Sequence, residues 1–436
     1  MKTLAGRKVA VAGMGRSGQA ASRLALSLGA EVTTVDSNPA AVPVDGCAAC
    51  HGRDPADMLA AQDRIVLSPG IPASHPMLDA ARQAGVPVIG ELGFAAEHCS
   101  LPMIAVTGTN GKSSTAWYCA QLLAQAGREP FIGGNFGTAL SSLVLEPGGH
   151  DIAVVEVSSY QLELPGGFRP RYAAALNLTP DHLARHGDME TYGRMKRRIF
   201  QNQREEDVAI SPKGDPRLHA RSAARQLWLD DCPGSSLTGR AIRLEGTRSD
   251  GEVDISGLKL LGEHNLQNVS AALLLAVSAG TDLQRLDVEA LLPLDHRLQT
   301  VHESEGVRWI NDSKATNIEA AMAGIAGVPG PQILLLGGQG KRGADYGQLR
   351  LPASRRARLV VCFGAAGPEI AEALGESLPV ETAPDLAGAA ALSAHLSRPG
   401  DNILLSPACS SFDEFDDFEH RGAAFAALAR QLGDAG

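Results

Sequence analysis

The sequence is short of positive charge and has no long apolar run. Its 39 lysines and arginines are outnumbered by 49 aspartates and glutamates, which leaves a formal net charge of -10. Nucleic acids and acidic membranes are bound by basic surfaces, so this balance argues against both kinds of partner. No apolar run approaches the roughly 18 residues that a membrane-spanning helix needs. We therefore expect no nucleic-acid binding and no membrane insertion.

An export signal and a disulfide pattern are also lacking. Basic residues precede an apolar stretch in MKTLAGRKVAVAGMGRSG, but the stretch is too short and continues into a glycine-rich turn. We expect a first β-strand there, in a cytoplasmic protein. The 7 cysteines are scattered and odd in number, so disulfides are not expected. CAACH at 47–51 has the C-x-x-C-H spacing of haem attachment, but that chemistry normally requires export, and we expect an incidental solvent-side loop.

Strand-like and helix-like patterns alternate along the chain in three blocks. Apolar strands meet glycine-rich or polar loops, as in KVAVAG, MIAVTG and VRWIND. Such alternation predicts parallel sheets covered by helices. A chain of 436 residues suits two or three domains. We predict three consecutive α/β domains at 1–98, 99–295 and 296–436, with short antiparallel strands in the polar segment 212–260.

A glycine fingerprint stands in the first block. Gly13, Gly15 and Gly18 of GMGRSG follow a strand and open a helix, and Asp36 ends the next strand. This is the setting in which backbone N–H groups at a helix N-terminus hold a diphosphate. Taken alone, the fingerprint fits a nicotinamide dehydrogenase, another diphosphate ligand, or a tight turn without a ligand.

A second glycine loop, TGTNGKSS at 107–114, connects a strand to a helix. The common P-loop, G-x-x-x-x-G-K-[ST], requires glycine where this chain has Val106, and Gly108 gives the shorter spacing G-x-x-G-K-S. Lys112 can place its ammonium on the β- and γ-phosphates, and the Ser113 hydroxyl can reach Mg²⁺. Two such loops indicate two phosphorylated ligands, and a hydride-transfer enzyme has no need for the second. The outer domains are therefore predicted to be Rossmann-like, and the central one P-loop ATPase-like with a mainly parallel sheet.

Three features downstream favour metal and phosphoryl chemistry. Glu156 ends the strand AVVEVSS, where a carboxylate suits a hard cation. NLTPDHL ends another strand and offers Asp181 and His182, although a single histidine in such a place is more often structural. Lys196 lies in the basic helix YGRMKRRIF, for which spacing alone favours a solvated positive face.

TGTNGKSS, EVSSYQLE, NLTPDHLARH and YGRMKRRIF together resemble the motifs of the Mur ligases, the ATP-dependent amide-forming enzymes of peptidoglycan synthesis. The shorter phosphate loop is the one of that family. WINDSKATN, LLLGGQGK and LLSPACSSFDEFDDFEHRG resemble the branch that adds D-glutamate to UDP-N-acetylmuramoyl-L-alanine. The resemblance covers essentially the whole chain in order. It implies ATP, two Mg²⁺ ions, these two substrates and a monomer.

The resemblance also implies roles for individual residues. The catalytic residues are Lys112, Lys196, His182 and Lys314. The ATP site comprises Gly108, Thr109, Asn110, Gly111, Lys112, Ser113, Ser114, Asn265, Asn268, His296, Arg297 and Asp312. The UDP-substrate site of the first domain and its neighbours comprises Arg16, Ser17, Asp36, Ser37, Ser68, Pro69, Gly70, Asn135 and His182. The amino-acid site comprises Thr316, Lys341, Ser411 and Phe418.

The metal ligands implied by the resemblance are Ser113, Glu156, His182 and Lys196. Lys196 would be carbamylated, because CO₂ converts its ammonium into a carboxylate that can bind Mg²⁺, and this replaces the solvated-face interpretation. The implied reaction forms an acyl phosphate that the amine of glutamate then attacks.

Alternatives to this reaction stay open. The same architecture can use L-glutamate. An NAD-dependent dehydrogenase is a more distant alternative, which leaves Lys112, Lys196 and NDSKATN without a role. A non-catalytic nucleotide-sensing scaffold requires losses at the phosphate or metal positions, and the sequence has none.

Overall fold

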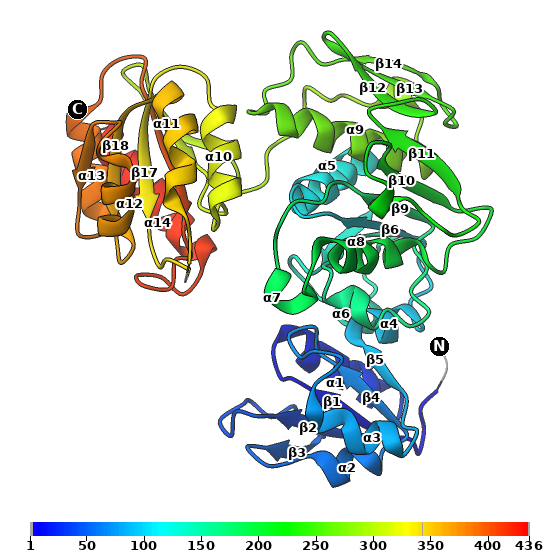
Figure 1. Ribbon diagram of the computed structural model, residues 1–436. Coiled ribbons are helices and arrows are strands. Elements are labelled where there is room, and N and C mark those ends of the chain that lie inside the picture. The colour runs from blue at the N-terminus through cyan, green and yellow to red at the C-terminus, as the bar shows by residue number, and fades with distance from the viewer. Residues whose placement is uncertain (1–2, 342, 435–436) are drawn as a thin grey trace. The chain divides into compact units, whose positions relative to one another are not determined.

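The computed structural model describes residues 3–341 and 343–434 (Figure 1). Three β-sheets of 5, 9 and 6 strands follow one another along the chain. The chain separates into two compact units, Met1–Leu258 with Gln267–Leu291, and Lys259–Leu266 with Leu292–Gly436. The predicted α/β class with mainly parallel sheets is confirmed, whereas the domain boundaries at 98/99 and 295/296 stay predictions. The described residues contain no helix that is long and apolar enough to cross a membrane.

The first sheet is parallel throughout, in the order β3-β2-β1-β4-β5. Val9 and Val11 of β1 pack with Leu24 of α1 on one face, and Ala10 packs with Leu59 of α2 on the other. Both faces are therefore covered, as the alternating pattern predicts. The elements are β1 Lys8–Ala12, α1 Arg16–Ser27, β2 Glu31–Asp36, β3 Ala48–His51, α2 Ala56–Ala60, β4 Arg64–Leu67, α3 Asp79–Gln83, β5 Val88–Gly90 and α4 Glu91–Ala96.

The CAACH segment is not the loop that we expected. Ala48–His51 forms β3, an edge strand in parallel register with β2. The His51 ring nitrogen Nε2 lies 3.0 Å from the Thr34 hydroxyl, and Cys47 and Cys50 are free thiols. Pairing with β2 satisfies the backbone of this segment, so the tertiary context overrides its weak local strand signal.

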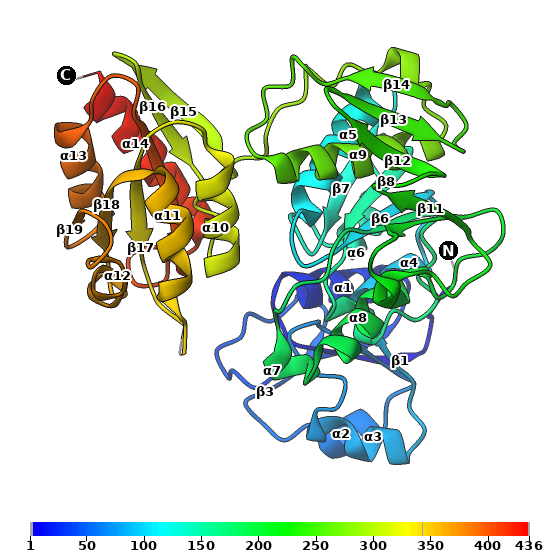
Figure 2. The same cartoon turned by 45° about the horizontal axis from the view of Figure 1, so that its top comes forward.

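The second sheet has the order β14-β13-β12-β11-β10-β9-β6-β8-β7. Its strands from β7 to β11 are parallel, and β12 also pairs with β11 in parallel. The antiparallel strands predicted for the polar segment 212–260 are therefore limited to the pairs β12–β13 and β13–β14 (Figure 2). The strands are β6 Met103–Thr107, β7 Pro130–Gly134, β8 Ile152–Glu156, β9 Tyr172–Ala175, β10 Val208–Pro212, β11 Arg225–Leu229, β12 Gly234–Thr238, β13 Ala241–Glu245 and β14 Gly251–Asp254. The helices are α5 Lys112–Gln125, α6 Leu140–Leu145, α7 Leu183–His186, α8 Met189–Arg197 and α9 Glu263–Ser278.

The third sheet has the order β15-β16-β20-β17-β18-β19, with only β15 antiparallel to its neighbour. Leu334 of β17 packs with Ile325 of α10, whereas Leu335 packs with Phe425 of α14 on the opposite face. The strands are β15 Gln299–Ser304, β16 Val307–Asn311, β17 Gln332–Gly337, β18 Ala357–Phe363, β19 Val380–Thr382 and β20 Asn402–Ala408. The helices are α10 Ile318–Gly327, α11 Arg350–Arg356, α12 Gly367–Leu374, α13 Leu386–Leu396 and α14 Phe418–Gly433.

Gly18 is the position where α1 passes closest to the glycine turn. A Cβ atom on Gly18 would lie 1.8 Å from the carbonyl oxygen of Gly13, whereas one on Gly15 would have nothing within 4 Å. We predict that Gly18→Ala destabilises the first domain by at least about 1–3 kcal/mol, as overpacking does. Gly15→Ala, at the N-cap of α1, is the matched control and should cost less than Gly18→Ala, because its Cβ atom meets no other atom. Hydrogen exchange of the amides of β1 and α1 measures the difference, and equal protection in both variants would contradict the prediction.

Candidate active site

The phosphate loop lies between β6 and α5, as the sequence predicts. Gly111 caps α5 with φ 83°, and a Cβ there would lie 2.2 Å from Oδ1 of Asn268 on α9. The amide of Asn110 donates to Oδ1 of Asn177 at 2.9 Å, and the Thr109 hydroxyl donates to the Thr179 carbonyl at 3.2 Å. The loop is therefore fixed by its surroundings at the N-terminus of a helix, which is a favourable place for phosphate.

Two lysines meet at one carbonyl group of this loop. Lys112 Nζ donates to Gly108 O at 2.9 Å and to Thr109 O at 2.7 Å. Lys196 Nζ, from α8, donates to the same Gly108 O at 2.6 Å, and Lys196 is only 1% exposed. Its neighbour Arg194 is exposed. The solvated-face interpretation of Lys196 is wrong, because α8 points this one cation inward.

The buried position changes the acid–base chemistry of Lys196. Burial lowers its pKa well below the usual value, and the charge of Lys112 lowers it further, while Asp181 and Glu156 oppose the change. A buried lysine with a lowered pKa keeps a larger fraction of neutral amine, which is the nucleophilic form.

Glu156 presents an unused oxygen to the same region. It ends β8 and is 3% exposed. Its Oε1 accepts from Asn135 Nδ2 at 2.7 Å, and its Oε2 is buried with no hydrogen-bond partner among the described residues. Leaving a carboxylate oxygen buried without a partner is unfavourable, so a cation fits here. The described residues contain no group of three or more His, Cys, Asp or Glu arranged for a metal. Mg²⁺ suits such a site, because it takes few protein ligands and completes its shell with phosphates and water.

His182 is held by neighbours that the sequence analysis missed. It precedes α7 with φ 54°, and its Nδ1 lies 3.0 Å from the Tyr160 hydroxyl. The guanidinium of Arg185 lies 4.8 Å from the centroid of the Tyr160 ring and pairs with both oxygens of Glu163 at 2.7 and 2.9 Å. All of these residues stand in the motifs EVSSYQLE and NLTPDHLARH, but only their packing reveals the contacts.

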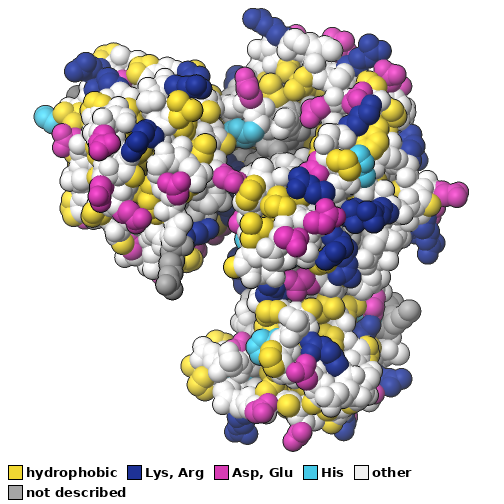
Figure 3. Space-filling view, viewed as in Figure 1, with side chains coloured by type: hydrophobic (Ala, Val, Ile, Leu, Met, Phe, Trp, Pro, Cys, Tyr) yellow, Lys and Arg dark blue, Asp and Glu magenta, His cyan; other side chains and the backbone are white. Residues whose placement is uncertain are grey.

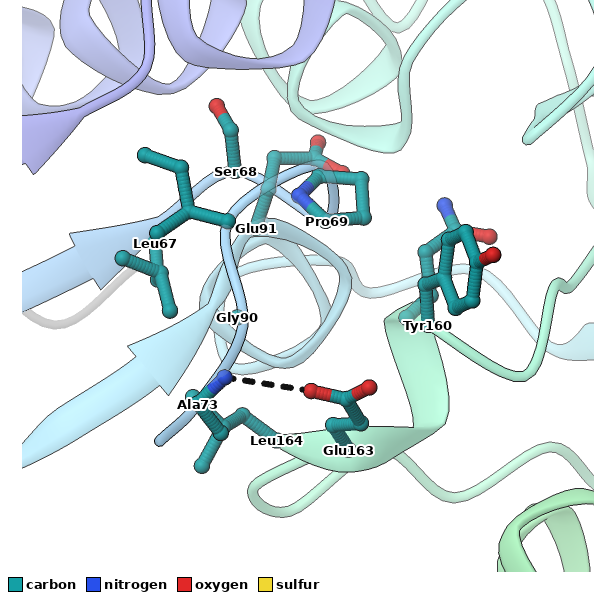
Figure 4. A pocket seen from close by; sticks show the side chains of 11 residues that line it. Leu67, Ser68, Pro69, Ala73, Gly90, Glu91, Tyr160, Glu163 and Leu164 are labelled. Atoms are coloured by element: carbon teal, nitrogen blue, oxygen red, sulfur yellow. Dashed lines mark hydrogen bonds between the residues drawn. The ribbon is translucent and has the colours of Figure 1, made fainter. Parts of the chain in front are cut away.

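Glu163 extends these contacts to a loop of the first sheet. Its Oε2 accepts from the backbone amide of Ala73 at 3.1 Å, in the loop that follows β4 (Figure 4). Together, Glu163 and Arg185 connect this loop to the Tyr160–His182 pair within one compact unit.

A cavity of about 320 Å³ opens between the loops that follow β1 and β4, where the strand order of the first sheet reverses. Such a reversal is where open α/β sheets bind ligands. Its lining includes seven residues predicted for the UDP-substrate, Arg16, Ser17, Asp36, Ser68, Pro69, Gly70 and Asn135. Ser37 and His182 are outside that lining. Because Asn135 also bonds Glu156, this cavity adjoins the candidate metal position.

Two of these residues also shape the cavity. Asp36 Oδ2 accepts from the amide of Met14 at 2.7 Å, and the Ser68 hydroxyl donates to Gly13 O at 2.7 Å. Both contacts fix the glycine turn, so these side chains have a structural use as well as a predicted ligand role.

The second unit brings its predicted residues to one edge of its sheet. Asp312, Lys314 and Thr316 follow β16, Lys341 follows β17, Ser411 follows β20, and Phe418 begins α14. The Lys314 ammonium lies 3.7 Å from the centroid of the Phe418 ring, and the His296 ring lies 6.3 Å from the same ring. Lys314 and His296, which are predicted for the ATP side, therefore lie near Phe418, which is predicted for the amino acid.

Asp312 is the most perturbed acid at this edge. Burial raises its pKa to about 7, against the opposing effects of the Ser406 hydroxyl and the charge of Arg297.

The two asparagines predicted for adenine lie on α9, where Asn265 donates to Leu261 O at 2.6 Å and Asn268 accepts from the Thr115 hydroxyl at 3.3 Å. The roles of all these residues stay predictions.

Three family models together match most of the chain. They are described as the Mur ligase MurD-like N-terminal domain at residues 7–90, the Mur ligase middle domain at 106–276, and the Mur ligase glutamate ligase domain at 296–409. A protein of Anaeromyxobacter dehalogenans is 40% identical over 98% of both chains. The chain belongs to the Mur ligase family. It is thus an ATP-dependent ligase that forms an amide bond.

Relatives of this Mur ligase carry a specific name. The Anaeromyxobacter protein is called UDP-N-acetylmuramoylalanine–D-glutamate ligase. A protein of Myxococcus xanthus with the same name is 38% identical over 98% of this chain and 99% of its own. Among solved structures, the MurF ligase of Thermotoga maritima in complex with ADP has a TM-score of 0.62 at 18% identity, covering 99% of this chain and 96% of its own. At that identity the likeness shows the fold alone.

Lys112 offers the most direct test of the phosphate loop. We predict that Lys112→Ala lowers turnover at least about 10²-fold, the scale for losing one charge-stabilising donor. The fold should persist, because the ammonium donates to Gly108 O and Thr109 O, two carbonyls of its own loop. ADP release measures the effect, and Lys213→Ala, which removes an exposed lysine paired with Asp231, is the control. Near-normal ADP release from folded Lys112→Ala would contradict the phosphate role.

Proposed function

We propose that this chain adds D-glutamate to UDP-N-acetylmuramoyl-L-alanine at the expense of ATP. The full-length relatives that carry this activity in their names are the observation on which the proposal rests. The cavity in the first unit supports this proposal. Seven residues predicted for the UDP-linked substrate line it, and the phosphate loop belongs to the same unit. We further propose that the enzyme acts in the cytoplasm, where ATP and UDP-linked precursors are available, and as a monomer.

The proposed reaction has two steps. An oxygen of the terminal alanine carboxylate attacks the γ-phosphorus of ATP, the bond to the β-phosphate oxygen breaks, and an acyl phosphate and ADP result. The amine of glutamate then attacks the acyl carbon, loses a proton, and displaces phosphate. Lys112 and Lys314 would balance the charge of the transferring group. Ser113, Glu156, His182 and a carbamylated Lys196 would hold Mg²⁺, which supplies further neutralisation of phosphate charge when bound.

The carbamate on Lys196 forms part of this proposal. The neutral amine would attack CO₂ and release a proton, so that a buried cation becomes a buried anion. That change removes the repulsion between Lys196 and Lys112, which contributes to the lowered pKa of Lys196. It also places a second negative group near Glu156, whose Oε2 lacks a partner among the described residues.

Replacement of Lys196 should therefore abolish activity through loss of a metal ligand. We predict that Lys196→Ala lowers turnover at least about 10²-fold, as loss of an electrostatic group at a reacting phosphate does. With ¹³C-labelled CO₂, the native protein should give a carbamate signal in NMR that Lys196→Ala lacks and Lys213→Ala keeps. An unmodified Lys196 in a structure with ATP and Mg²⁺ bound would contradict the carbamate.

The amino-acid pocket favours an acidic acceptor. Glutamate brings two carboxylates, but only its amine reacts, so both carboxylates need donors. Lys341 can supply a positive charge from the loop after β17, and Thr316 and Ser411 can supply hydroxyl groups. A neutral acceptor such as alanine has no second carboxylate for Lys341, so it loses a hydrogen bond to a charged group, which is worth roughly 1.5–3 kcal/mol. The D configuration rests on the names of the relatives, since both glutamates carry the same groups.

We predict that D-glutamate is the preferred acceptor. The enzyme with ATP and UDP-N-acetylmuramoyl-L-alanine is incubated separately with D-Glu, L-Glu, D-Asp and L-Ala, and ADP release and product mass are measured. Preferred coupling of L-Glu would overturn only the stereochemical assignment. Preferred coupling of L-Ala would overturn the assignment of the pocket as well.

A further inference from the structure

Arg421 is a buried cation that the predicted ligand sets leave out. It stands in the first turn of α14, within the sequence FEHRG, and is 0% exposed. Burying arginine is unfavourable unless its donors are satisfied, so its hydrogen-bond partners show which segments of the chain it holds together.

The guanidinium bonds two loops at the carboxyl ends of strands. Its Nε donates to the Ser313 hydroxyl and its Nη2 to the Ser313 carbonyl, both at 2.9 Å, in the loop after β16. Its Nη2 and Nη1 donate to the carbonyls of Cys409 and Ser410 after β20, both at 3.1 Å. Ser313 in turn donates through its hydroxyl to Phe418 O at 2.8 Å, which ties in the start of α14.

A third loop passes directly against the same group. A Cβ atom on Gly338, which follows β17, would lie 2.9 Å from Nη1 of Arg421. Glycine at this position lets the backbone that leads to Lys341 approach the guanidinium. Arg421 therefore contacts every segment that bears a predicted acceptor residue. The next residue after Ser313 is Lys314, the next after Ser410 is Ser411, and α14 begins with Phe418.

The charge of Arg421 is not neutralised by these bonds. All four acceptor atoms are uncharged oxygens of hydroxyl or carbonyl groups. Burial lowers the pKa of Arg421 to about 10, partly offset by Cys409, Asp413 and Glu414, so the group stays cationic at neutral pH. A cation in a poorly solvated interior acts over a longer distance than one at the surface.

We propose that Arg421 is a positioning residue of the acceptor site, and that its charge favours an acceptor with net negative charge over a neutral one. The inference rests on the proposed function for the identity of the acceptor. As a positioning residue, Arg421 sets the spacing of the loops that carry Lys314, Lys341 and Ser411. As a permanent cation, it adds to Lys341 in attracting an amino acid that has two carboxylates.

Two variants separate geometry from charge. Arg421→Lys keeps the cation but cannot reach both loops with one ammonium, whereas Arg421→Gln removes the charge. With the full-length enzyme, we expect Arg421→Lys to raise KM for D-glutamate roughly tenfold, the scale for losing a hydrogen bond to a charged group. It should keep the preference for D-glutamate over its neutral isostere D-glutamine. Arg421→Gln should raise KM for D-glutamate further and lower that preference at least about tenfold.

The controls lie in the same and in the other unit. Arg358→Lys disturbs a partly exposed arginine of the same unit, which bonds Asp401 and Leu396 O at the amino ends of the strands, and it should leave KM for D-glutamate within about twofold. The KM for UDP-N-acetylmuramoyl-L-alanine should also stay unchanged in both Arg421 variants, because its predicted cavity lies in the first unit. If Arg358→Lys also raises the KM for D-glutamate, the effect of the Arg421 variants reflects general stability of this unit, and the proposal is overturned.

The remaining outcomes are also decisive. An unchanged D-glutamate KM in a folded Arg421 variant would overturn the positioning role, and an unchanged preference over D-glutamine in Arg421→Gln would overturn the charge role. If Arg421→Gln does not fold, Ser313→Ala takes its place, since it removes one acceptor and the tie to Phe418. We expect it to raise the D-glutamate KM severalfold, and no rise would contradict the proposal. Assay of the wild-type enzyme comes first, so that use of another amino acid refutes the proposed function separately.

Discussion

A cation that is removed from water must be hydrogen-bonded, because desolvating it without partners costs several kcal/mol. In this enzyme most of these partners are main-chain carbonyls of loops at the carboxyl ends of strands, and the Ser313 hydroxyl is a further one. Lys196 donates to Gly108 O in the first unit, and Arg421 donates to Ser313 O, Cys409 O and Ser410 O in the second. The hydrogen bonds that satisfy each buried cation therefore also fix the loop that accepts them. Charges of both signs are interspersed over the face of the molecule that Figure 3 shows.

The carbonyl bonds of Lys112 suggest how the phosphate loop receives its ligand. Its ammonium donates to Gly108 O and Thr109 O, two carbonyls of its own loop. A phosphate oxygen is a charged acceptor and forms stronger bonds with an ammonium than a carbonyl does. Lys112 can thus exchange acceptors with little change in the backbone, because the loop is also fixed by Asn177 and by the close approach of Asn268 to Gly111.

Sequence patterns predicted the parts of this structure that depend on local periodicity and strand ends. The glycine turns, Glu156 at the end of β8 and the alternating sheet cores belong to this class. Contacts between segments far apart in the chain were not predictable in this way. The spacing of YGRMKRRIF fits a solvated helix, and only packing of α8 on the phosphate loop shows why Lys196 is buried. Residues 48–51 of CAACH form a strand because they pair with β2. The bonds of Arg421 reach loops 11 and 108 residues away in sequence, so the sequence alone could not show its role.

The two buried cations differ in a way that matches their different uses. Burial lowers the pKa of Lys196 well below its usual value, which makes its amine available for reaction, whereas the pKa of Arg421 falls only to about 10. A lysine can therefore change its charge in place, and an arginine in a similar environment cannot. Exchanging the two residue types would reverse these properties. Arginine at position 196 could not become an anion beside Glu156, and lysine at position 421 would have too few donors, in the wrong geometry, for the loops around it. Under the two proposals, position 196 needs a group whose charge can change and position 421 needs a permanent charge, and lysine and arginine meet these different needs.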